Sequence, residues 1–196
     1  MKEILANIDK YLTALLTSLG VFGPILGSIL ILLESIIPVL PLSVFITLNF
    51  YAFGNIFGFF ISYILTVIGC NMAFYLSRKV LSNRMEYLTK KYDKNKLLKL
   101  IEQFSNIKFK HLVLLFAFPF TPAFLINILS GVSKMEHNKF LIASIIGKPF
   151  MVFFWGYIGV TLIQSLTHPT YLIEVLLIML AAYVISVIIN KKFGLD

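Results

Sequence analysis

Two closely spaced pairs of prolines inside uncharged hydrophobic stretches constrain this chain most strongly. One pair is Pro38 and Pro41, and the other is Pro119 and Pro122. Each proline removes a backbone donor and clashes with the preceding helical turn, so neither stretch can form one continuous helix. In a bilayer, broken backbone is tolerated only where protein or a water-filled cavity satisfies its polar groups. Because broken segments at matching places in two halves of a chain point to a transport site, the two pairs bear on function as well as fold.

The composition indicates an integral membrane protein. Of the 196 residues, 59% are hydrophobic, and the mean hydropathy is +0.90. A soluble domain of this size could not bury so much apolar surface. We therefore predict a single all-α membrane domain over residues 1–196, located in the cell membrane. The formal charge of +8 is explained better by basic cytoplasmic segments than by nucleic-acid binding.

Four stretches are long and apolar enough to be transmembrane helices, since about 20 residues cross the hydrocarbon core. The four stretches lie at residues 11–33, about 50–77, about 140–163 and about 170–190. The segments with the proline pairs are predicted to be re-entrant helical hairpins instead, at about 34–48 and 112–131. A hairpin enters and leaves the membrane on the same side.

Residues 78–110 form the only long polar segment, with ten Lys or Arg against three acidic residues. Leu97, Leu98, Ile101 and Phe104 recur at helical spacing within it, which predicts an amphipathic helix. The simplest interpretation is a cytoplasmic segment that fixes the topology. A compatible interpretation is a surface helix that binds anionic lipid, at about 1 kcal/mol per basic residue.

The distribution of lysines favours a hairpin, not a crossing, for the second proline segment. If this segment turns back, the lysines that follow it remain on the same side as the basic segment 78–110. These lysines are Lys134, Lys139, Lys191 and Lys192. Both termini are then cytoplasmic, and the two hairpins enter from opposite sides. The result is an inverted repeat with facing tips, in which Pro41 and Pro122 are separated by 81 residues.

Two charged residues inside the apolar segments are candidates for function. Glu34 is the only acidic residue between Lys10 and Glu86, and a charge at the bilayer centre costs about 2.5–3.5 kcal/mol. Glu34 either caps the first helix near the headgroups or faces a hydrated cavity, where it could bind an ammonium group or a proton. Lys148 either extends along the helix to the cytoplasmic surface or contacts a phosphate.

The hairpins add uncharged polar groups at Ser43, Thr121 and Asn127. The amide of Asn127 is the strongest of these candidates, because an amide at membrane depth needs partners. Half-helices in a hairpin also present free backbone N–H groups that suit phosphate. The sequence shows no nucleophile motif, metal-ligand cluster or phosphate-binding loop. We therefore predict neither enzyme activity nor a metal or cofactor.

The order of these motifs resembles the DedA, or VTT-domain, superfamily, and is nearest to its Tvp-like branch. The resemblance covers about residues 20–165 and is carried by Glu34-x-x-x-Pro38-x-x-Pro41, by Pro119-x-x-Pro122-x-x-x-x-Asn127-x-x-x-Gly131, by Phe140, by Gly147 to Pro149 and by Gly156 to Gly159. It implies two facing re-entrant hairpins and the movement of lipids between leaflets. By position, Glu34 corresponds to the membrane-embedded acid of that family.

The chain departs from the typical family pattern at three places. A second acidic residue after the first proline pair is replaced by Leu42 and Ser43, and two arginines are replaced by Phe116 and Pro122. Lys148 is the cation that could compensate for the missing arginines. These departures favour a zwitterionic substrate such as phosphatidylethanolamine over a polyprenyl-phosphate lipid.

The sequence thus predicts a lipid translocase or scramblase that binds membrane phospholipids. Its predicted substrate contacts come from both hairpins and from the following helix: Glu34, Pro38, Pro41, Ser43, Pro119, Thr121, Pro122, Asn127 and Lys148. Two alternatives stay open. One is a scaffold without transport activity that binds lipids or partners through residues 78–110, and the other is a proton-coupled carrier of a small solute. The direction of transport and homo-oligomerisation also stay open.

Overall fold

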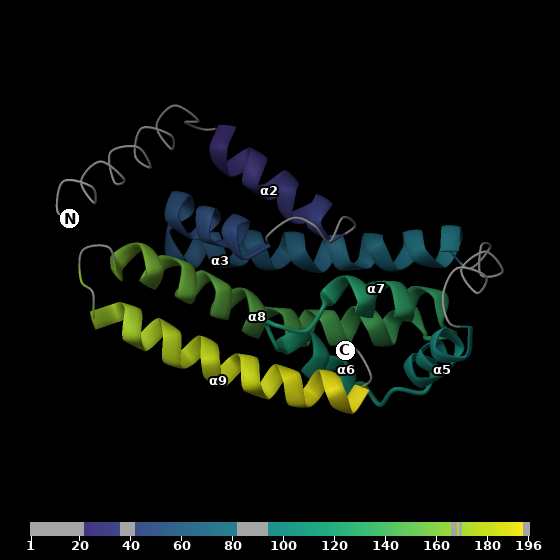
Figure 1. Ribbon diagram of the computed structural model, residues 1–196. Helices are drawn as coiled ribbons and strands as arrows, with labels where there is room; N and C mark the ends of the chain where they lie inside the picture. Colours follow the sequence, from purple (N-terminus) through teal and green to yellow (C-terminus); the bar gives the residue numbers. More distant parts are fainter. Residues whose placement is uncertain (1–21, 36–41, 82–93, 166–167, 169, 194–196) are drawn as a thin grey trace.

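The computed structural model describes residues 22–35, 42–81, 94–165, 168 and 170–193. Regular structure in these residues is entirely helical (Figure 1). In chain order the elements are α2 (Phe22–Glu34), α3 (Leu42–Leu76), the π-helix η1 (Ser77–Leu81), α5 (Lys94–Ser105), α6 (Phe109–Ala117), α7 (Ala123–Val132), α8 (His137–Ser165) and α9 (Thr170–Phe193). Pro38 and Pro41 lie outside the described residues, as does part of the predicted span 11–33.

Three of the described helices are long and apolar enough to cross a membrane. They cover Leu42–Val80, His137–Ser165 and Thr170–Lys192. Their outer faces carry large exposed hydrophobic side chains, such as Phe57 with 71% and Leu177 with 63% of its surface exposed. Such a continuous apolar exterior suits lipid and not water. The prediction of an all-helical membrane protein is therefore confirmed.

Helix α3 reverses direction at Gly54, where φ is 76° and ψ is 171°. This conformation is essentially restricted to glycine. The chain folds back so closely that a Cβ atom on Gly58 would lie 2.5 Å from the carbonyl oxygen of Asn49. The Asn49 amide also donates a hydrogen bond to Ser62 Oγ at 3.1 Å. Helix α3 therefore consists of an arm, residues 42–53, and a long segment, residues 55–76, so the long helix begins later than the predicted start at about 50.

Helices α6 and α7 form a second broken unit around the second proline pair. They have 9 and 10 residues, or about 14–15 Å each, and neither alone crosses a core of about 30 Å. Phe118, which precedes Pro119, is extended with φ −83° and ψ 129°, because a residue before proline is disfavoured in helical geometry. Pro122 then caps α7 and accepts backbone hydrogen bonds from Leu125 and Ile126.

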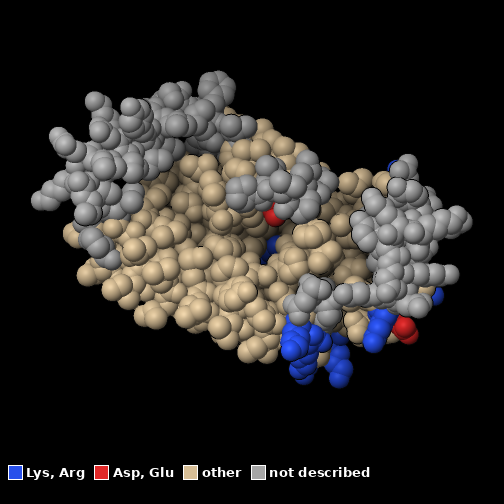
Figure 2. All heavy atoms as spheres, in the orientation of Figure 1, with Lys and Arg blue, Asp and Glu red and all other residues tan. Residues whose placement is uncertain are grey.

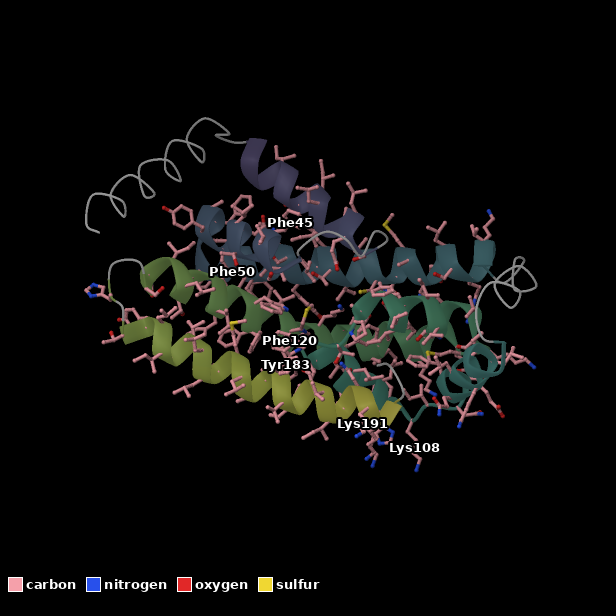
Figure 3. The ribbon with its side chains drawn as sticks, in the orientation of Figure 1. Phe45, Phe50, Lys108, Phe120, Tyr183 and Lys191 are labelled. Atoms are coloured by element: carbon pink, nitrogen blue, oxygen red, sulfur yellow. The ribbon has the colours of Figure 1, made fainter. Side chains whose placement is uncertain are left out.

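The connection between α6 and α7 lies beside the middle of α8 and the second half of α9. The Phe120 ring packs edge-on against Trp155 and Tyr183, with centroids 5.3 and 5.7 Å apart (Figure 3). The Asn190 amide donates to the carbonyl oxygen of Phe120 at 3.3 Å. The C-terminal part of α9 lies at one end of the molecule. The start of α6 and the last residues of α7 lie at this same end, whereas α2 begins at the opposite end (Figure 1).

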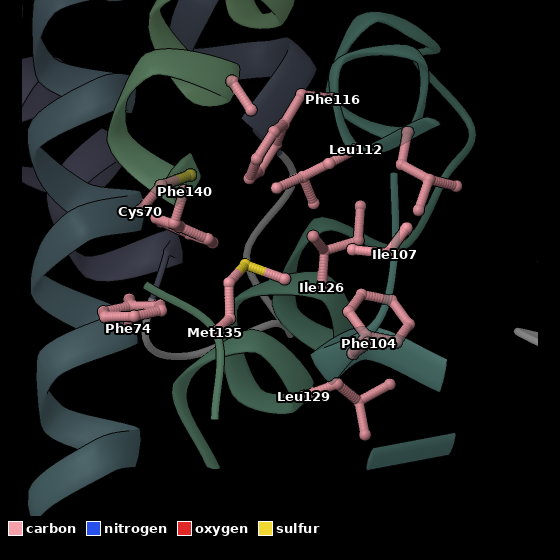
Figure 4. Packing of buried hydrophobic residues seen from close by; sticks show 12 residues of the cluster. Cys70, Phe74, Phe104, Ile107, Leu112, Phe116, Ile126, Leu129, Met135 and Phe140 are labelled. Atoms are coloured by element: carbon pink, nitrogen blue, oxygen red, sulfur yellow. The ribbon is translucent and has the colours of Figure 1, made fainter. Parts of the chain in front are cut away.

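A hydrophobic cluster joins the second broken unit to the long helices (Figure 4). The rings of Phe74 on α3 and Phe140 on α8 lie 4.4 Å apart at its centre. The predicted amphipathic helix exists as α5, and its Phe104 is buried in the same cluster. Leu98, which the periodicity also placed on the apolar face, is 43% exposed, and Leu100 packs against the cluster in its place. The apolar face of α5 therefore covers protein.

Arg78, in η1 directly after α3, forms hydrogen bonds to the end of α7 and to the connection between α7 and α8. Its guanidinium group donates hydrogen bonds to the carbonyl oxygens of Gly131, Ser133 and Met135 at 3.1, 3.1 and 2.6 Å. The same group stacks 4.4 Å from the centre of the Phe74 ring. A planar guanidinium group is suited to several acceptors in fixed directions, and an ammonium group is not.

We expect Arg78→Lys to lower the free energy of unfolding by ~2 kcal/mol, because hydrogen bonds from a charged donor are lost. Thermal unfolding of the purified protein in detergent measures this change. Lys79→Gln is the matched control, since Lys79 is exposed and adjacent. Equal unfolding temperatures for the two variants would contradict this role for Arg78.

Candidate functional site

Two opposite charges meet inside the apolar body of the protein. Glu34 ends α2 and is half-buried, and Lys148 in α8 is close enough for its charge to act on Glu34. Figure 2 shows a red and a blue patch close together in a hollow near the centre of the view, away from the other coloured patches. The remaining visible Lys and Arg gather at one end of the molecule. An interaction between charges is strong in such an environment, because little water screens it.

Lys148 does not extend to the surface, which excludes one of the two interpretations of its sequence position. Its side chain is 1% exposed, and its Nζ lies 5.4 Å from the centre of the Phe116 ring. Helix α6 presses against α8 here, since a Cβ atom on Gly147 would lie 2.7 Å from the carbonyl oxygen of Val113. A buried cation inside a membrane protein usually marks a substrate or ion pathway.

The second broken unit places several polar side chains in the interior without hydrogen-bond partners. Asn127 is 1% exposed, and neither its Oδ1 nor its Nδ2 has a partner. The hydroxyl groups of Thr121 and Ser130 are buried and also unpartnered. Leaving such a group unsatisfied costs about 1–3 kcal/mol. These groups are therefore available to bind a polar ligand. Pro119 and Pro122 flank Thr121 and shape the backbone that positions it.

The end of α2 meets the second broken unit at a small cavity of about 210 Å³. Ser35, the residue after Glu34, lines this cavity together with Ala73 of α3 and Phe124 and Ile128 of α7. The structure thus brings the end of α2 to the same place as α7. Asn127 is on the same helix, α7, but it is not among the residues that line this cavity.

Two serines of the first predicted hairpin make hydrogen bonds within their own helices. Ser43 is half-buried, and its carbonyl oxygen accepts a hydrogen bond from Thr47 Oγ1 at 2.7 Å. Ser35 is buried and bonds its own helix through the carbonyl oxygen of Ile31. The roles predicted for Pro38 and Pro41 concern positions outside the described residues.

Sequence reasoning missed a polar contact between the two long helices. Asn71 on α3 donates to Ser144 Oγ at 3.4 Å, and its Oδ1 lies 3.1 Å from Nε2 of His137 on α8. Asn49, which is fully buried in the arm, was also missed. The only signal in the sequence at both asparagines is an amide inside an apolar run.

Comparisons with known proteins show the family to which the chain belongs. A family model described as "VTT domain" matches residues 40–161, a range that includes both Asn127 and Lys148. The chain is also similar to "Uncharacterized membrane protein YhjE" of Bacillus subtilis (strain 168). The identity is 32% over 171 residues, which cover 82% of this chain and 77% of that protein. No solved structure matches the chain.

Proposed function

Because the chain belongs to the VTT-domain (DedA) family, we propose that it is a translocase that moves phospholipids between membrane leaflets. The observation that carries this proposal is that the buried Lys148 lies close enough to the half-buried Glu34, inside an apolar molecule, for its charge to act on the carboxylate. A zwitterionic headgroup carries an ammonium group and a phosphate group. A carboxylate and an ammonium group of the protein at one place complement both charges.

The repeated spacing of helix boundaries supports two inverted re-entrant hairpins. The arm begins at Leu42 and α7 begins at Ala123, 81 residues later. The same separation relates Pro41 to Pro122. In each half a long helix follows the short one, and α2 begins at the end of the molecule opposite to the start of α6 (Figure 1). This arrangement would bring two helix breaks together near the centre of the bilayer.

The hairpins would lower the barrier that makes unassisted lipid movement slow. That barrier is the cost of removing a polar headgroup from water. In our proposal the headgroup crosses along the hollow, with its ammonium group beside Glu34 and its phosphate beside Lys148. The unpartnered groups of Thr121 and Asn127 supply further hydrogen bonds, while the acyl chains stay in the surrounding lipid.

We further propose that the end of the molecule that holds the lysines faces the cytoplasm. Lys108 and Lys191 lie together at this end (Figure 3). Lys134 is exposed in the connection between α7 and α8, next to the Arg78 contacts. A concentration of basic residues on one side is the usual mark of the cytoplasmic face. The second broken unit then enters from the cytoplasm and the first from the outside.

Reconstitution tests the proposed function. Purified protein in liposomes should transfer fluorescent phosphatidylethanolamine between leaflets faster than it transfers phosphatidylglycerol, because only the former headgroup has an ammonium group for Glu34. Chemical quenching of the outer leaflet measures the transfer, with protein-free liposomes as the control. Transfer of neither headgroup above the control rate would contradict the proposal, whereas equal rates would contradict only the ammonium contact.

A further inference from the structure

A second cavity, which neither Glu34 nor Lys148 lines, lies at the lysine-rich end. Its volume is about 280 Å³. Three elements that are distant in sequence build it, namely the end of α5, the start of α6 and the last turn of α9. The lining residues are Gln103, Asn106, Ile107, Lys108, His111 and Lys192. Figure 3 shows Lys108 beside Lys191, so two lysines of the last turn of α9 lie close to the cavity.

The cavity carries an excess of positive charge. Lys108 and Lys192 line it, and none of its described lining residues is acidic. Partial burial lowers the pKa of the His111 imidazole, and the charges of Lys110, Lys192 and Lys108 lower it further. Several cations thus act on one half-buried ring. A cavity with charges of a single sign concentrates ions of the opposite sign.

The donors around the cavity suit a phosphate group. Two ammonium groups and two side-chain amides can donate hydrogen bonds to phosphate oxygens. The cavity also includes the start of α6, where Lys108 is the N-cap residue and makes no side-chain capping bond. Backbone N–H groups at such a terminus favour an anion.

The position of the cavity points to a lipid as the source of that phosphate. Lys192 ends the last candidate membrane span, so the cavity lies where the hydrocarbon region ends and headgroups begin. Basic residues at this depth attract anionic lipids. A volume of about 280 Å³ is smaller than a typical drug-sized site, and it suits a headgroup whose acyl chains remain in the bilayer.

We propose that this cavity is a binding site for the phosphate of an anionic lipid headgroup in the leaflet at the lysine-rich end. A phosphomonoester headgroup fits best, because its two negative charges match Lys108 and Lys192. The site is separate from the Glu34–Lys148 hollow, and the inference requires only that the protein is embedded in a membrane. This binding site can therefore be tested whether or not the protein transports lipid.

Nuclear magnetic resonance of isotope-labelled histidine in the full-length protein tests the site. In nanodiscs of phosphatidylcholine, the addition of about 20% phosphatidic acid should raise the ring pKa of His111 by about one unit, as a nearby opposite charge does. The ring of His168 is the internal control, because His168 lies in the connection between α8 and α9 at the other end of the molecule. Equal shifts for the two rings would overturn the proposal.

Substitutions and a soluble anion complete the test. Lys108→Gln and Lys192→Gln should each reduce the lipid-induced change at His111 by at least about half, since each removes one of two matching charges. Lys134→Gln removes an exposed charge at the same end of the molecule and should leave the change intact. Equal losses in all three variants would mean that general surface charge, and not this cavity, causes the change at His111. That result would overturn the proposal. Inorganic phosphate supplies the same chemical group without a lipid. If about 10 mM phosphate, enough to fill a site of roughly millimolar affinity, caused a shift of the same size in phosphatidylcholine nanodiscs, the assignment to lipid would be overturned.

Discussion

Glu34→Gln should reduce phospholipid transfer in liposomes by about 10-fold or more. Glutamine keeps the size of the side chain, but it removes the charge that would attract the ammonium group of the lipid. Interactions of this kind are worth about 1.5–3 kcal/mol, and 1.4 kcal/mol corresponds to a factor of ten. Glu136→Gln is the matched control, because Glu136 is exposed in the connection between α7 and α8. If the Glu34→Gln variant transferred phospholipid at the wild-type rate, the carboxylate would have no part in the mechanism.

A double variant separates a shared role from two independent ones. Lys148→Met should also reduce transfer, because the buried ammonium group is lost while the volume is largely kept. In our proposal Glu34 and Lys148 hold the same headgroup, so the combined variant should lose less than the product of the two single reductions. Strict additivity of the two free-energy changes would indicate that the residues act at different points of the path.

Gly58→Ala should be among the most destabilising single substitutions outside the charged residues. A Cβ atom at Gly58 would lie 2.5 Å from the Asn49 carbonyl oxygen and 2.6 Å from the Phe50 Cα. Both of these are backbone atoms, so the arm itself would have to move. Overpacking of this kind costs about 1–3 kcal/mol. Thermal unfolding in detergent and the monodisperse fraction in size-exclusion chromatography should both fall.

Gly27→Ala is the matched control for this prediction. A Cβ atom at Gly27 would meet only the side-chain oxygen of Asn49, at 3.3 Å. A side chain can shift by a few tenths of an ångström at little cost, whereas a backbone carbonyl in a helix cannot. Gly58→Ala unfolding at the same temperature as Gly27→Ala would contradict the close packing of the arm against the long segment of α3.

The second helix break could be predicted from the sequence because its cause is local. Pro119 and Pro122 prevent helical geometry at the residues that precede them, whatever surrounds them. The reversal at Gly54 was missed because its cause is tertiary. A glycine in an apolar run is compatible with a helix, and only the packing of the arm on the long segment selects a positive φ.

The same difference between local and tertiary causes applies to the candidate site. The sequence indicated Glu34, Asn127 and Lys148 as candidates because polar groups are expensive within a membrane. It left the environment of Lys148 undecided, since the burial of this side chain depends on α6, whose Phe116 ring covers it. The cavity of Lys108 and Lys192 could not be predicted, because it requires α5, α6 and α9 to meet at one end of the molecule.

Thiol labelling from each side of the membrane tests most directly whether the two helix breaks enter from opposite faces. Single cysteines would be introduced by Ser43→Cys and Phe118→Cys, both at half-buried positions, in a chain whose only natural cysteine, the buried Cys70, is replaced by alanine. Our account predicts that a membrane-impermeant maleimide labels position 43 only from the outside and position 118 only from the cytoplasm. Labelling of both positions from the same side, or of neither from any side, would contradict it.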